Sequence, residues 1–219
     1  MAASSEPQQS PSDLHGSPTH DPTQLIVGIS GASGAIYGVR LLELLAPQPD
    51  VQTHLVISQA GKLTIGIETS QTVAEVEALA DHAYATRDIG ASISSGSFAA
   101  TAMIVAPCSM KTLSAIVNSY SDNLLTRAAD VMLKERRPLI LMPRESPLHV
   151  GHTRLLHQAA EMGIHLCPPM PAFYNNPKTL DDVINHSIGR ALDLIGIDVG
   201  VVHRWAGRPS PADVNRAAQ

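Results

Sequence analysis

The sequence predicts a single three-layer α/β/α domain built on a parallel β-sheet. Short apolar runs alternate with amphipathic segments along most of the chain, which is the order that successive strand–helix units produce. The 219 residues, of which 44% are hydrophobic, suffice for one ordinary domain with a buried core. The chain contains no internal repeat with a period of roughly 20 to 50 residues, so a repeat architecture is not indicated.

The first half of the chain supplies two strands and three helices. Its apolar runs predict buried strands over residues 25–29 and 51–57. Residues 35–45 have a helical pattern that ends before a proline, and another helix starts near Ser58. Residues 72–75 read T-V-A-E, a capping box that opens a further short helix.

The second half adds three strands and four helices. We expect, in order, a strand over 102–106, a helix after Ser109, a helix over about 122–137, a strand over 138–142, a helix over 149–162 and a short strand over 164–166. Thr179 then caps a long final helix, whose apolar residues between Leu180 and Ile195 fall on one face. Strands alternating with helices predict a parallel sheet that is covered by helices on both faces.

The two ends of the chain differ from the domain between them. Residues 1–23 are rich in Ser, Pro, Gln and His, and they contain too little apolar surface to offset the entropy cost of ordering. They also lack the basic start and apolar centre of a secretory signal. We therefore expect a disordered extension over 1–23, a domain over 24–207 and a flexible tail over 208–219.

Composition excludes several classes of protein. The net charge of −5 gives no support to nucleic-acid binding, and two cysteines are too few for a disulfide scaffold. No apolar run approaches the roughly 20 residues that a membrane span requires. Charged residues make up 16% of the chain, below the usual value of about 25%, which favours burial of surface between subunits. These features suit a cytoplasmic enzyme or ligand-binding domain.

The residues that follow the strands indicate a phosphate site. In folds of this kind, ligands bind beyond the carboxyl ends of the strands. Three predicted strands lead into serine-bearing turns that open helices, and a fourth leads into an arginine; these segments are 30–34, Ser58, 107–109 and 143–146. Backbone N–H groups at helix N-termini, hydroxyls and a guanidinium group together suit a phosphate.

The first of these turns favours a mononucleotide over a dinucleotide. Gly28, Gly31 and Gly34 are spaced G-x-x-G-x-x-G, whereas the dinucleotide fingerprint is G-x-G-x-x-G. Ser58 stands where an acidic residue would hold a ribose. FMN therefore fits the pattern better than NAD. The alternative is that the serines of these turns only cap helices.

Several other polar segments have ordinary structural explanations. Residues 94–97 fit a flexible turn. The positive charges of Arg136 and Arg137 are explained by a favourable interaction with the dipole at a helix C-terminus. Cys108 is expected to be a small buried side chain rather than a nucleophile. The three histidines within 149–157 lack the partner pattern of a metal site, so we expect no metal.

Three later features point to the site instead. Arg144 and Glu145 form a charged pair directly after a buried strand, where ligands bind. Tyr174 lies in the proline-rich loop 168–177, which could act as a lid. Trp205, the one tryptophan of the sequence, follows the last helix, where an aromatic side chain often covers a site or an interface.

Several motifs together resemble the UbiX family of flavin prenyltransferases. They occur in the family's order from about Leu25 to Trp205, and such a series is far more specific than one glycine turn. The matching segments are 28–35, 94–97, 127–131, 133–139, 143–145 and 171–174.

The resemblance implies a Rossmann-like, flavodoxin-like domain that binds reduced FMN and dimethylallyl phosphate. Members of the family join the dimethylallyl group to N5 and C6 of the flavin without a metal. The product, prenylated FMN, serves UbiD-type decarboxylases, including the one of ubiquinone biosynthesis. The family typically forms homododecamers with active sites at subunit contacts. Whether the donor is the monophosphate or the diphosphate is left open.

The resemblance also implies roles for individual residues. The flavin is expected to contact Gly31, Ala32, Ser33, Ser58, Ser109, Met110, Lys111, Thr112 and Arg144. The phosphate of the prenyl donor is expected to meet Lys134, Arg144, Tyr174 and Arg190. Glu145 matches the family's acid/base residue, Glu68 a second carboxylate near the prenyl chain, and Trp205 an aromatic at the border of the site. Gln59 departs from the lysine expected after the serine.

Three alternative functions remain open at this point. A cysteine decarboxylase of the wider family also uses an FMN site, but it needs a histidine base where this chain has Tyr37. A non-catalytic carrier would bind FMN and hand it to a decarboxylase without forming a covalent product. An aromatic-acid decarboxylase in its own right is disfavoured by the chain's small size and by the lack of a metal-site pattern.

Overall fold

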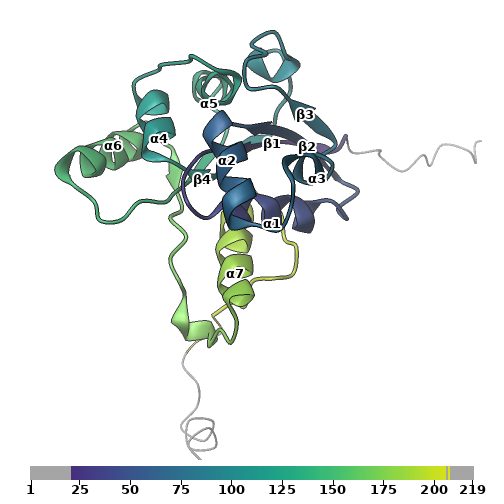
Figure 1. The fold of residues 1–219 in the computed structure, drawn as a ribbon, viewed down its shortest axis with the longest axis vertical. Coiled ribbons are helices and arrows are strands. Elements are labelled where there is room, and N and C mark those ends of the chain that lie inside the picture. The colour runs from purple at the N-terminus through teal and green to yellow at the C-terminus, as the bar shows by residue number, and fades with distance from the viewer. Residues whose placement is uncertain (1–20, 206, 208–219) are drawn as a thin grey trace, which may run out of the picture.

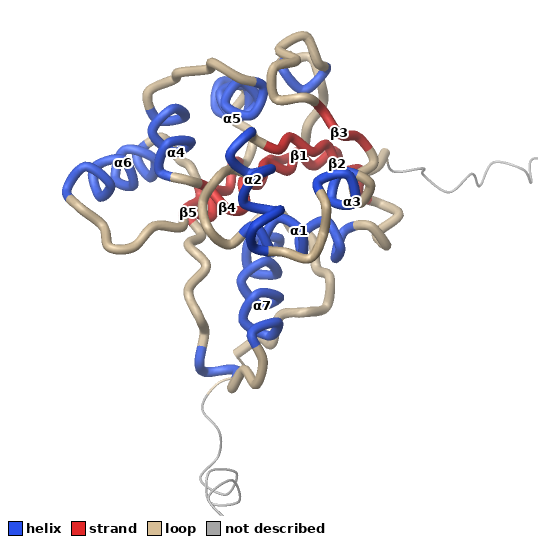
Figure 2. The backbone as a smooth tube through the Cα atoms, in the orientation of Figure 1, coloured by secondary structure: helices blue, strands red, loops and turns tan. Residues whose placement is uncertain are grey.

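The computed structural model describes residues 21–205 and 207, and it contains one six-stranded parallel sheet. The strands lie in the order β3-β2-β1-β4-β5-β6 (Figures 1 and 2). Their bounds are β1 Thr23–Ile29, β2 Val51–Ile57, β3 His82–Tyr84, β4 Ala102–Cys108, β5 Leu139–Pro143 and β6 His165–Leu166. The predicted extension 1–23 falls almost wholly, and the predicted tail 208–219 entirely, outside the described residues.

The helices cover both faces of the sheet, as the sequence predicts. Their bounds are α1 Ala35–Leu45, α2 Gln59–Glu68, α3 Val73–Glu77, α4 Met110–Val117, α5 Leu124–Lys134, α6 Val150–Glu161 and α7 Leu180–Asp193, with 3₁₀ turns η1 at Ser92–Ser94 and η2 at Phe173–Asn175. One apolar core joins α1, α2, α3 and α7 to one face of the sheet. A second core joins α4, α5 and α6 to the opposite face. The three-layer α/β/α prediction is therefore confirmed.

Alternating side chains divide the central strands between these two cores. In β4, Ile104 packs into the first core, whereas its neighbours Met103 and Val105 pack into the second. Successive side chains of a strand point to opposite faces, so a strand that is covered on both sides must be apolar throughout. This explains the continuous apolar runs of the sequence.

Strand β3 is the one that the sequence analysis missed. It is three residues long, lies at the edge of the sheet and pairs with β2 from His54 to Val56. Its residues are exposed or half-buried, so they carry no apolar run. Without β3 the remaining strands follow the 2-1-3-4-5 order of flavodoxin-like sheets, and the segment predicted as a fifth strand becomes β6.

The helix predicted over 122–137 is shorter in the structure. It begins after Asn123, whose side chain caps it, and ends at Lys134. Arg136 adopts a left-handed conformation with φ of 55°, which ends the helix before Arg137. The prediction that both arginines only interact with the helix dipole is wrong for Arg137. Its guanidinium donates to the carbonyl oxygens of Phe98 and Gly96, at 2.5 and 3.0 Å.

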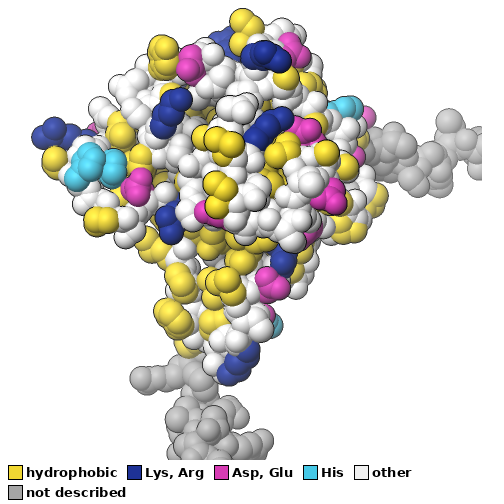
Figure 3. Space-filling model, in the orientation of Figure 1, with side chains coloured by type: hydrophobic (Ala, Val, Ile, Leu, Met, Phe, Trp, Pro, Cys, Tyr) yellow, Lys and Arg dark blue, Asp and Glu magenta, His cyan; other side chains and the backbone are white. Residues whose placement is uncertain are grey.

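The chain after β6 leaves the sheet and forms a protrusion. This arm, defined here as residues 167–183, contains η2 at its tip, and α7 returns along it toward the sheet (Figure 1). Hydrophobic side chains gather over this region in the space-filling view (Figure 3). Met170, Phe173 and Leu180 are 72, 78 and 73% exposed.

Candidate active site

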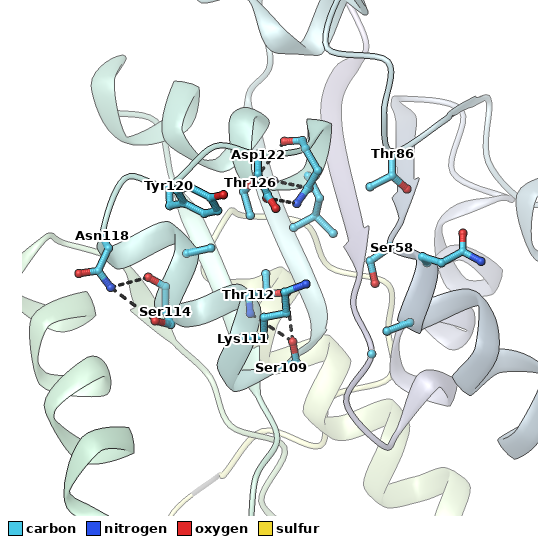
Figure 4. A pocket seen from close by; sticks show the side chains of 16 residues that line it. Ser58, Thr86, Ser109, Lys111, Thr112, Ser114, Asn118, Tyr120, Asp122 and Thr126 are labelled. Carbon is cyan, nitrogen blue, oxygen red and sulfur yellow. Dashed lines mark hydrogen bonds between the residues drawn. The ribbon is translucent and has the colours of Figure 1, made fainter.

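A cavity of about 820 Å³ lies beyond the carboxyl ends of β1 and β2 and beside the N-termini of α4 and α5 (Figure 4). It lies near the point where the strand order reverses between β1 and β4, the position at which folds of this kind bind ligands. Its lining brings together five residues predicted to contact the flavin, namely Gly31, Ser58, Ser109, Lys111 and Thr112.

Two of the predicted serines both cap helices and line the cavity. The Ser58 hydroxyl accepts a hydrogen bond from the N–H of Gly61, at 3.0 Å, and so caps α2. The Ser109 hydroxyl accepts from the N–H of Thr112, at 3.2 Å, and so caps α4. The structural and the functional interpretation of these serines are therefore compatible. Two helix N-termini, with their partial positive charge, border the same hollow.

A buried serine, Ser30, holds the turn at residues 30–34 (called the first turn below) against the end of β4. The Ser30 hydroxyl donates to the carbonyl oxygen of Pro107, at 2.8 Å, and accepts from the N–H of Ser109, at 2.7 Å. Gly31 packs so closely against α2 that a Cβ there would lie 2.3 Å from the Cβ of Ala60. Gly34 has φ of +100°, a conformation that favours glycine. The turn is thus positioned by residues that cannot be enlarged.

Glu68 is held against this turn as an ionised carboxylate. Its Oε2 accepts hydrogen bonds from the backbone N–H groups of Gly34 and Ala35, at 2.7 and 3.0 Å. Burial opposes ionisation, but these bonds, a hydrogen bond with Ser33 and the positive charge of Arg144 together keep the pKa of Glu68 below its ordinary value. Glu68 therefore anchors the N-terminus of α1.

Arg144 and Glu145 follow β5, and both are exposed. The Arg144 N–H donates to the carbonyl oxygen of Cys108, at 3.1 Å, which ties the segment to the end of β4. Burial raises the pKa of Tyr37, and the charge of Arg144 partly offsets this effect. Arg144 therefore lies near Tyr37 and Glu68, beside the first turn. Glu145 accepts a hydrogen bond from the N–H of Ser146, at 3.0 Å.

Ala32 and Met110, also predicted to contact the flavin, are buried, with 8 and 9% exposure. The Met110 side chain belongs to the second apolar core. A contact with a ligand at this position would therefore have to come from the backbone N–H in the first turn of α4.

Three predicted residues gather at the arm instead of at the cavity. The rings of Tyr174 and Trp205 meet edge to face with centroids 5.8 Å apart, and both side chains are exposed. Arg190, in the last turn of α7, pairs with Asp193 at 2.6 Å. Residues of the arm are absent from the lining of the cavity within the described chain.

Lys134 lies at a third place. It ends α5, whereas the first turn of α5 lines the cavity through Leu125 and Thr126. A helix of 11 residues is about 16 Å long, so a single chain does not bring Lys134 to the cavity. Lys134 forms an ion pair with Glu135 beside Gly96, in the serine-rich loop. Arg127 also holds this loop, by donating to the carbonyl oxygen of Ser94 at 3.1 Å.

The sequence analysis missed several cavity residues, most clearly Thr86 and the pair Asp122 and Asn123. Thr86 follows the missed strand β3. Its hydroxyl donates to the carbonyl oxygen of Ile57 at 2.5 Å, and its own carbonyl accepts from the N–H of Leu124. Asn123 was detectable, because an Asn before an apolar helical run is a capping signal. Its Oδ1 accepts from the N–H of Thr126, at 3.1 Å.

Other candidates take structural roles. Burial raises the pKa of Cys108 to about 12, so the thiol stays protonated, in line with the predicted buried role. His149 caps α6, and the centroid of its ring lies 3.6 Å from the ring centroid of His152. Among residues 21–205 there is no group of three His, Cys, Asp or Glu side chains that could hold a metal ion. No helix in that same stretch is long and apolar enough to cross a membrane.

The sequence matches known proteins over most of its length. Residues 15–186 match the family model described as Flavoprotein. The chain is 59% identical over 186 residues to the flavin prenyltransferase UbiX of Escherichia coli (strain K12), a match that covers 84% of this chain and 98% of that protein.

Two solved structures of UbiX-like proteins are also similar to this chain. A dodecameric FMN-dependent UbiX-like decarboxylase from Escherichia coli O157:H7 is 49% identical, with a TM-score of 0.83 and coverage of 84% of this chain and 100% of that one. The structure of AnUbiX (PadA1) in complex with FMN and dimethylallyl pyrophosphate is 44% identical, also with a TM-score of 0.83, and covers 86 and 100%.

The cysteine decarboxylase SpaF is a more distant neighbour. It is 17% identical, with a TM-score of 0.56, and the match covers 68% of this chain and 85% of that one. This likeness shows a shared fold alone, whereas the identity to UbiX proteins is several times higher. The chain therefore belongs to the flavoprotein family and, within it, to the UbiX flavin prenyltransferases.

Proposed function

We propose that this enzyme joins the dimethylallyl group of dimethylallyl phosphate to N5 and C6 of reduced FMN. The product, prenylated FMN, would serve a UbiD-type decarboxylase in ubiquinone biosynthesis or in the decarboxylation of aromatic acids. The observation that carries the proposal is the cavity at the sheet's switch point, bordered by the capped N-termini of α2 and α4. Family membership and the FMN complex of a relative support it.

The residues present suit FMN. A cavity of about 820 Å³ falls within the roughly 300–1,000 Å³ typical of ligand sites. Ser58, Ser109 and Thr112 supply hydroxyls, and the helix N-termini supply backbone N–H groups for a phosphate. The remaining proposed flavin contacts are Gly31, Ala32, Ser33, Met110, Lys111 and Arg144. Reduced FMN, when bound, supplies the nucleophilic N5 and the ring carbon C6.

The other proposed roles concern the prenyl donor. Lys134, Arg144 and Arg190 are cationic, and the Tyr174 hydroxyl can donate a hydrogen bond. Together they would stabilise the charge that develops on phosphate as the allylic C–O bond breaks. A bound dimethylallyl pyrophosphate in a relative supports a site for a prenyl phosphate.

Ring closure requires a proton at the alkene and loss of the proton at C6. We assign proton delivery to Glu145 or to the released phosphate. Glu68 is held ionised by the first turn, so it carries no proton to deliver. Trp205 would exclude water from the reacting carbons.

The proposed site needs more than one subunit. Lys134, the Tyr174–Trp205 pair and the cavity occupy three separate places in one chain. The exposed apolar side chains of the arm suit burial against another copy. A dodecameric relative supports a homododecamer with sites at subunit contacts. We propose residues 24–207 as the catalytic domain of a cytoplasmic enzyme.

Anaerobic product analysis tests this function. Purified protein is mixed with FMN, dithionite and dimethylallyl phosphate, and the extracted flavin is analysed by mass spectrometry. We expect a flavin heavier by one prenyl unit, and parallel reactions with the diphosphate identify the preferred donor. A parallel reaction without the prenyl donor serves as the control. Unmodified FMN that nevertheless binds tightly would contradict the proposal and indicate a carrier.

A further inference from the structure

His186 lies between two polar side chains of the arm. It belongs to α7 and is 5% exposed. Its Nδ1 is 2.9 Å from Asn175 Nδ2, and its Nε2 is 3.3 Å from the Tyr174 hydroxyl oxygen. The imidazole ring also meets the Tyr174 ring edge to face, with centroids 5.8 Å apart. Neither Asn175 nor His186 belongs to the motifs that carry the family resemblance.

The amide of Asn175 determines which ring nitrogen of His186 carries the proton. Because Nδ2 is a donor, Nδ1 must accept, and the proton of a neutral imidazole then lies on Nε2. The reverse amide orientation would place the NH₂ group where Oδ1 now lies, buried without a partner in the described chain. An unpaired buried N–H group is rarer in proteins than an unpaired carbonyl oxygen. The observed orientation is therefore the favoured one.

The charges around His186 keep the ring neutral. Burial lowers its pKa, and the positive charge of Arg190 and the neighbouring His203 lower it further, while Asp193 opposes them. A neutral ring has a single N–H. With Nδ1 occupied as an acceptor, this N–H points to the Tyr174 oxygen.

The direction of this hydrogen bond matters for the proposed phosphate contact. A phosphate dianion offers only acceptors, so a tyrosine that binds it must donate its hydroxyl hydrogen. If Tyr174 donated to His186, that hydrogen would be occupied. If His186 donates to Tyr174, the hydrogen is free. The long 3.3 Å separation leaves the hydroxyl able to adjust when a ligand binds.

Two aromatic rings pack edge to face against the Tyr174 ring. Trp205 packs against it edge to face, at 84°, and His186 does so at 82°. Arg190 lies four residues after His186 on α7, a spacing that places both on one face of the helix. The Arg190 guanidinium, which pairs with Asp193, therefore extends from the helix face that also carries His186.

We propose that His186 is a positioning residue for the prenyl donor. Held by Asn175 with its proton on Nε2, it donates to the Tyr174 oxygen and leaves the tyrosine hydrogen free for a phosphate oxygen. This inference rests on the proposed function, in which Tyr174 contacts the donor phosphate.

Two amide variants of His186 test the proposal. The amide of His186→Gln reaches the place of Nε2 and can still donate to Tyr174, whereas that of His186→Asn reaches only the place of Nδ1. We expect KM for dimethylallyl phosphate to rise roughly three- to tenfold in His186→Asn, the size of one neutral hydrogen bond. In His186→Gln it should stay within about twofold of wild type. KM for FMN should be unchanged in both.

A double-mutant comparison separates positioning from a structural role. Tyr174→Phe alone should raise KM for the donor by at least as much as His186→Asn does. If His186 acts through the hydroxyl, His186→Asn should add nothing to the Tyr174→Phe protein. Additive effects, or equal effects of Asn and Gln at position 186, would overturn the proposal.

A spectroscopic readout reports the protonated ring nitrogen in the wild-type protein itself. Solid-state ¹⁵N spectra of the wild-type protein, with labelled histidine and His186→Gln for assignment, should show His186 protonated at Nε2. Protonation at Nδ1 would contradict the inference. Failure of the proposed function is distinguishable, since wild type would then form no prenylated flavin at all.

Discussion

At the residue scale, local contacts give two carboxylates of the proposed site different properties. Glu68 receives two backbone hydrogen bonds that fix it to the first turn and hold its pKa low. Glu145 is exposed on the segment after β5 and accepts a hydrogen bond from its neighbour Ser146. The first is therefore suited to positioning and the second to proton transfer.

Substituting each carboxylate by its amide should separate these properties. We expect Glu145→Gln to bind FMN normally but to turn over at least about 100-fold more slowly, because general acid catalysis is lost. Glu68→Gln should instead weaken FMN binding, because a neutral amide holds the turn less firmly. Rapid-quench kinetics and FMN titration measure the two effects. Near-normal turnover of Glu145→Gln would mean that phosphate supplies the proton.

His54 makes stability depend on pH. It is 3% exposed, its Nε2 donates to Gln24 Oε1 at 2.7 Å, and its Nδ1 lies 3.0 Å from the Tyr84 hydroxyl. Burial, aided by the neighbouring His82 and opposed by Asp81, lowers the pKa of His54 from 6.5 to about 4. The folded protein therefore takes up this proton less readily than the unfolded chain.

The contribution of His54 should be fully present above pH 6.5 and lost as the pH falls toward 4. The slope is at most about 1.4 kcal/mol per pH unit. Urea unfolding between pH 4 and 7 measures it, with His54→Phe as the reference. An unchanged slope in that variant would show that other groups dominate acid unfolding.

At the element scale, helix caps connect local sequence to the cavity. Ser58 and Ser109 each directly follow a strand, cap the next helix and line the cavity, because the carboxyl end of a parallel strand meets the N-terminus of the next helix. Thr72 caps α3 with a full capping box, yet it is absent from the cavity lining.

This difference provides a matched pair of variants. Ser109→Ala and Thr72→Ala should each lower the free energy of unfolding by about 1 kcal/mol, since each removes one cap. Ser109→Ala alone should also weaken FMN binding, by about tenfold. Urea titrations and fluorescence titrations of FMN measure the two effects. Equal FMN affinity in both proteins would limit Ser109 to capping.

At the scale of the whole molecule, the proposed catalytic groups are dispersed. Lys134 lies at the far end of α5, and Arg190 lies on α7 beside the arm, so the proposed site forms only if assembly brings them to a common cavity. When a site is built from two subunits, an oligomer that mixes two different inactive variants can contain complete sites.

Two inactive variants should therefore complement each other. Lys134→Ala and Arg190→Ala subunits, each expected to be nearly inactive alone, are coexpressed with different tags and purified by both. Where the two side chains come from different chains, roughly a quarter of the sites in a random mixture regain both. Prenylated FMN is then measured by mass spectrometry. Mixed oligomers without recovered activity would place both residues in one chain's site.

Much of the fold was predictable from the sequence by itself. The bounds of α1 and β2 agree with prediction, and the expected caps of α2, α3, α4 and α7 are confirmed. These features depend on signals within a few residues, such as a hydroxyl before a helix or an apolar run between turns. The prediction of a phosphate site at one edge follows from them, because parallel strands deliver their carboxyl ends to one side of the sheet.

Tertiary structure decided the features that local sequence patterns do not encode, namely an edge strand and the distances between predicted site residues. Strand β3 forms because its backbone pairs with β2, although its three residues carry no apolar run. Thr86 follows this strand and lines the cavity, so it was missed together with β3. The resemblance placed Lys134, Tyr174 and Arg190 at one phosphate, but within a chain Lys134 lies at the end of α5, apart from Tyr174 and Arg190 near the arm. Distances between segments depend on how helices pack on the sheet, and no single segment encodes that packing.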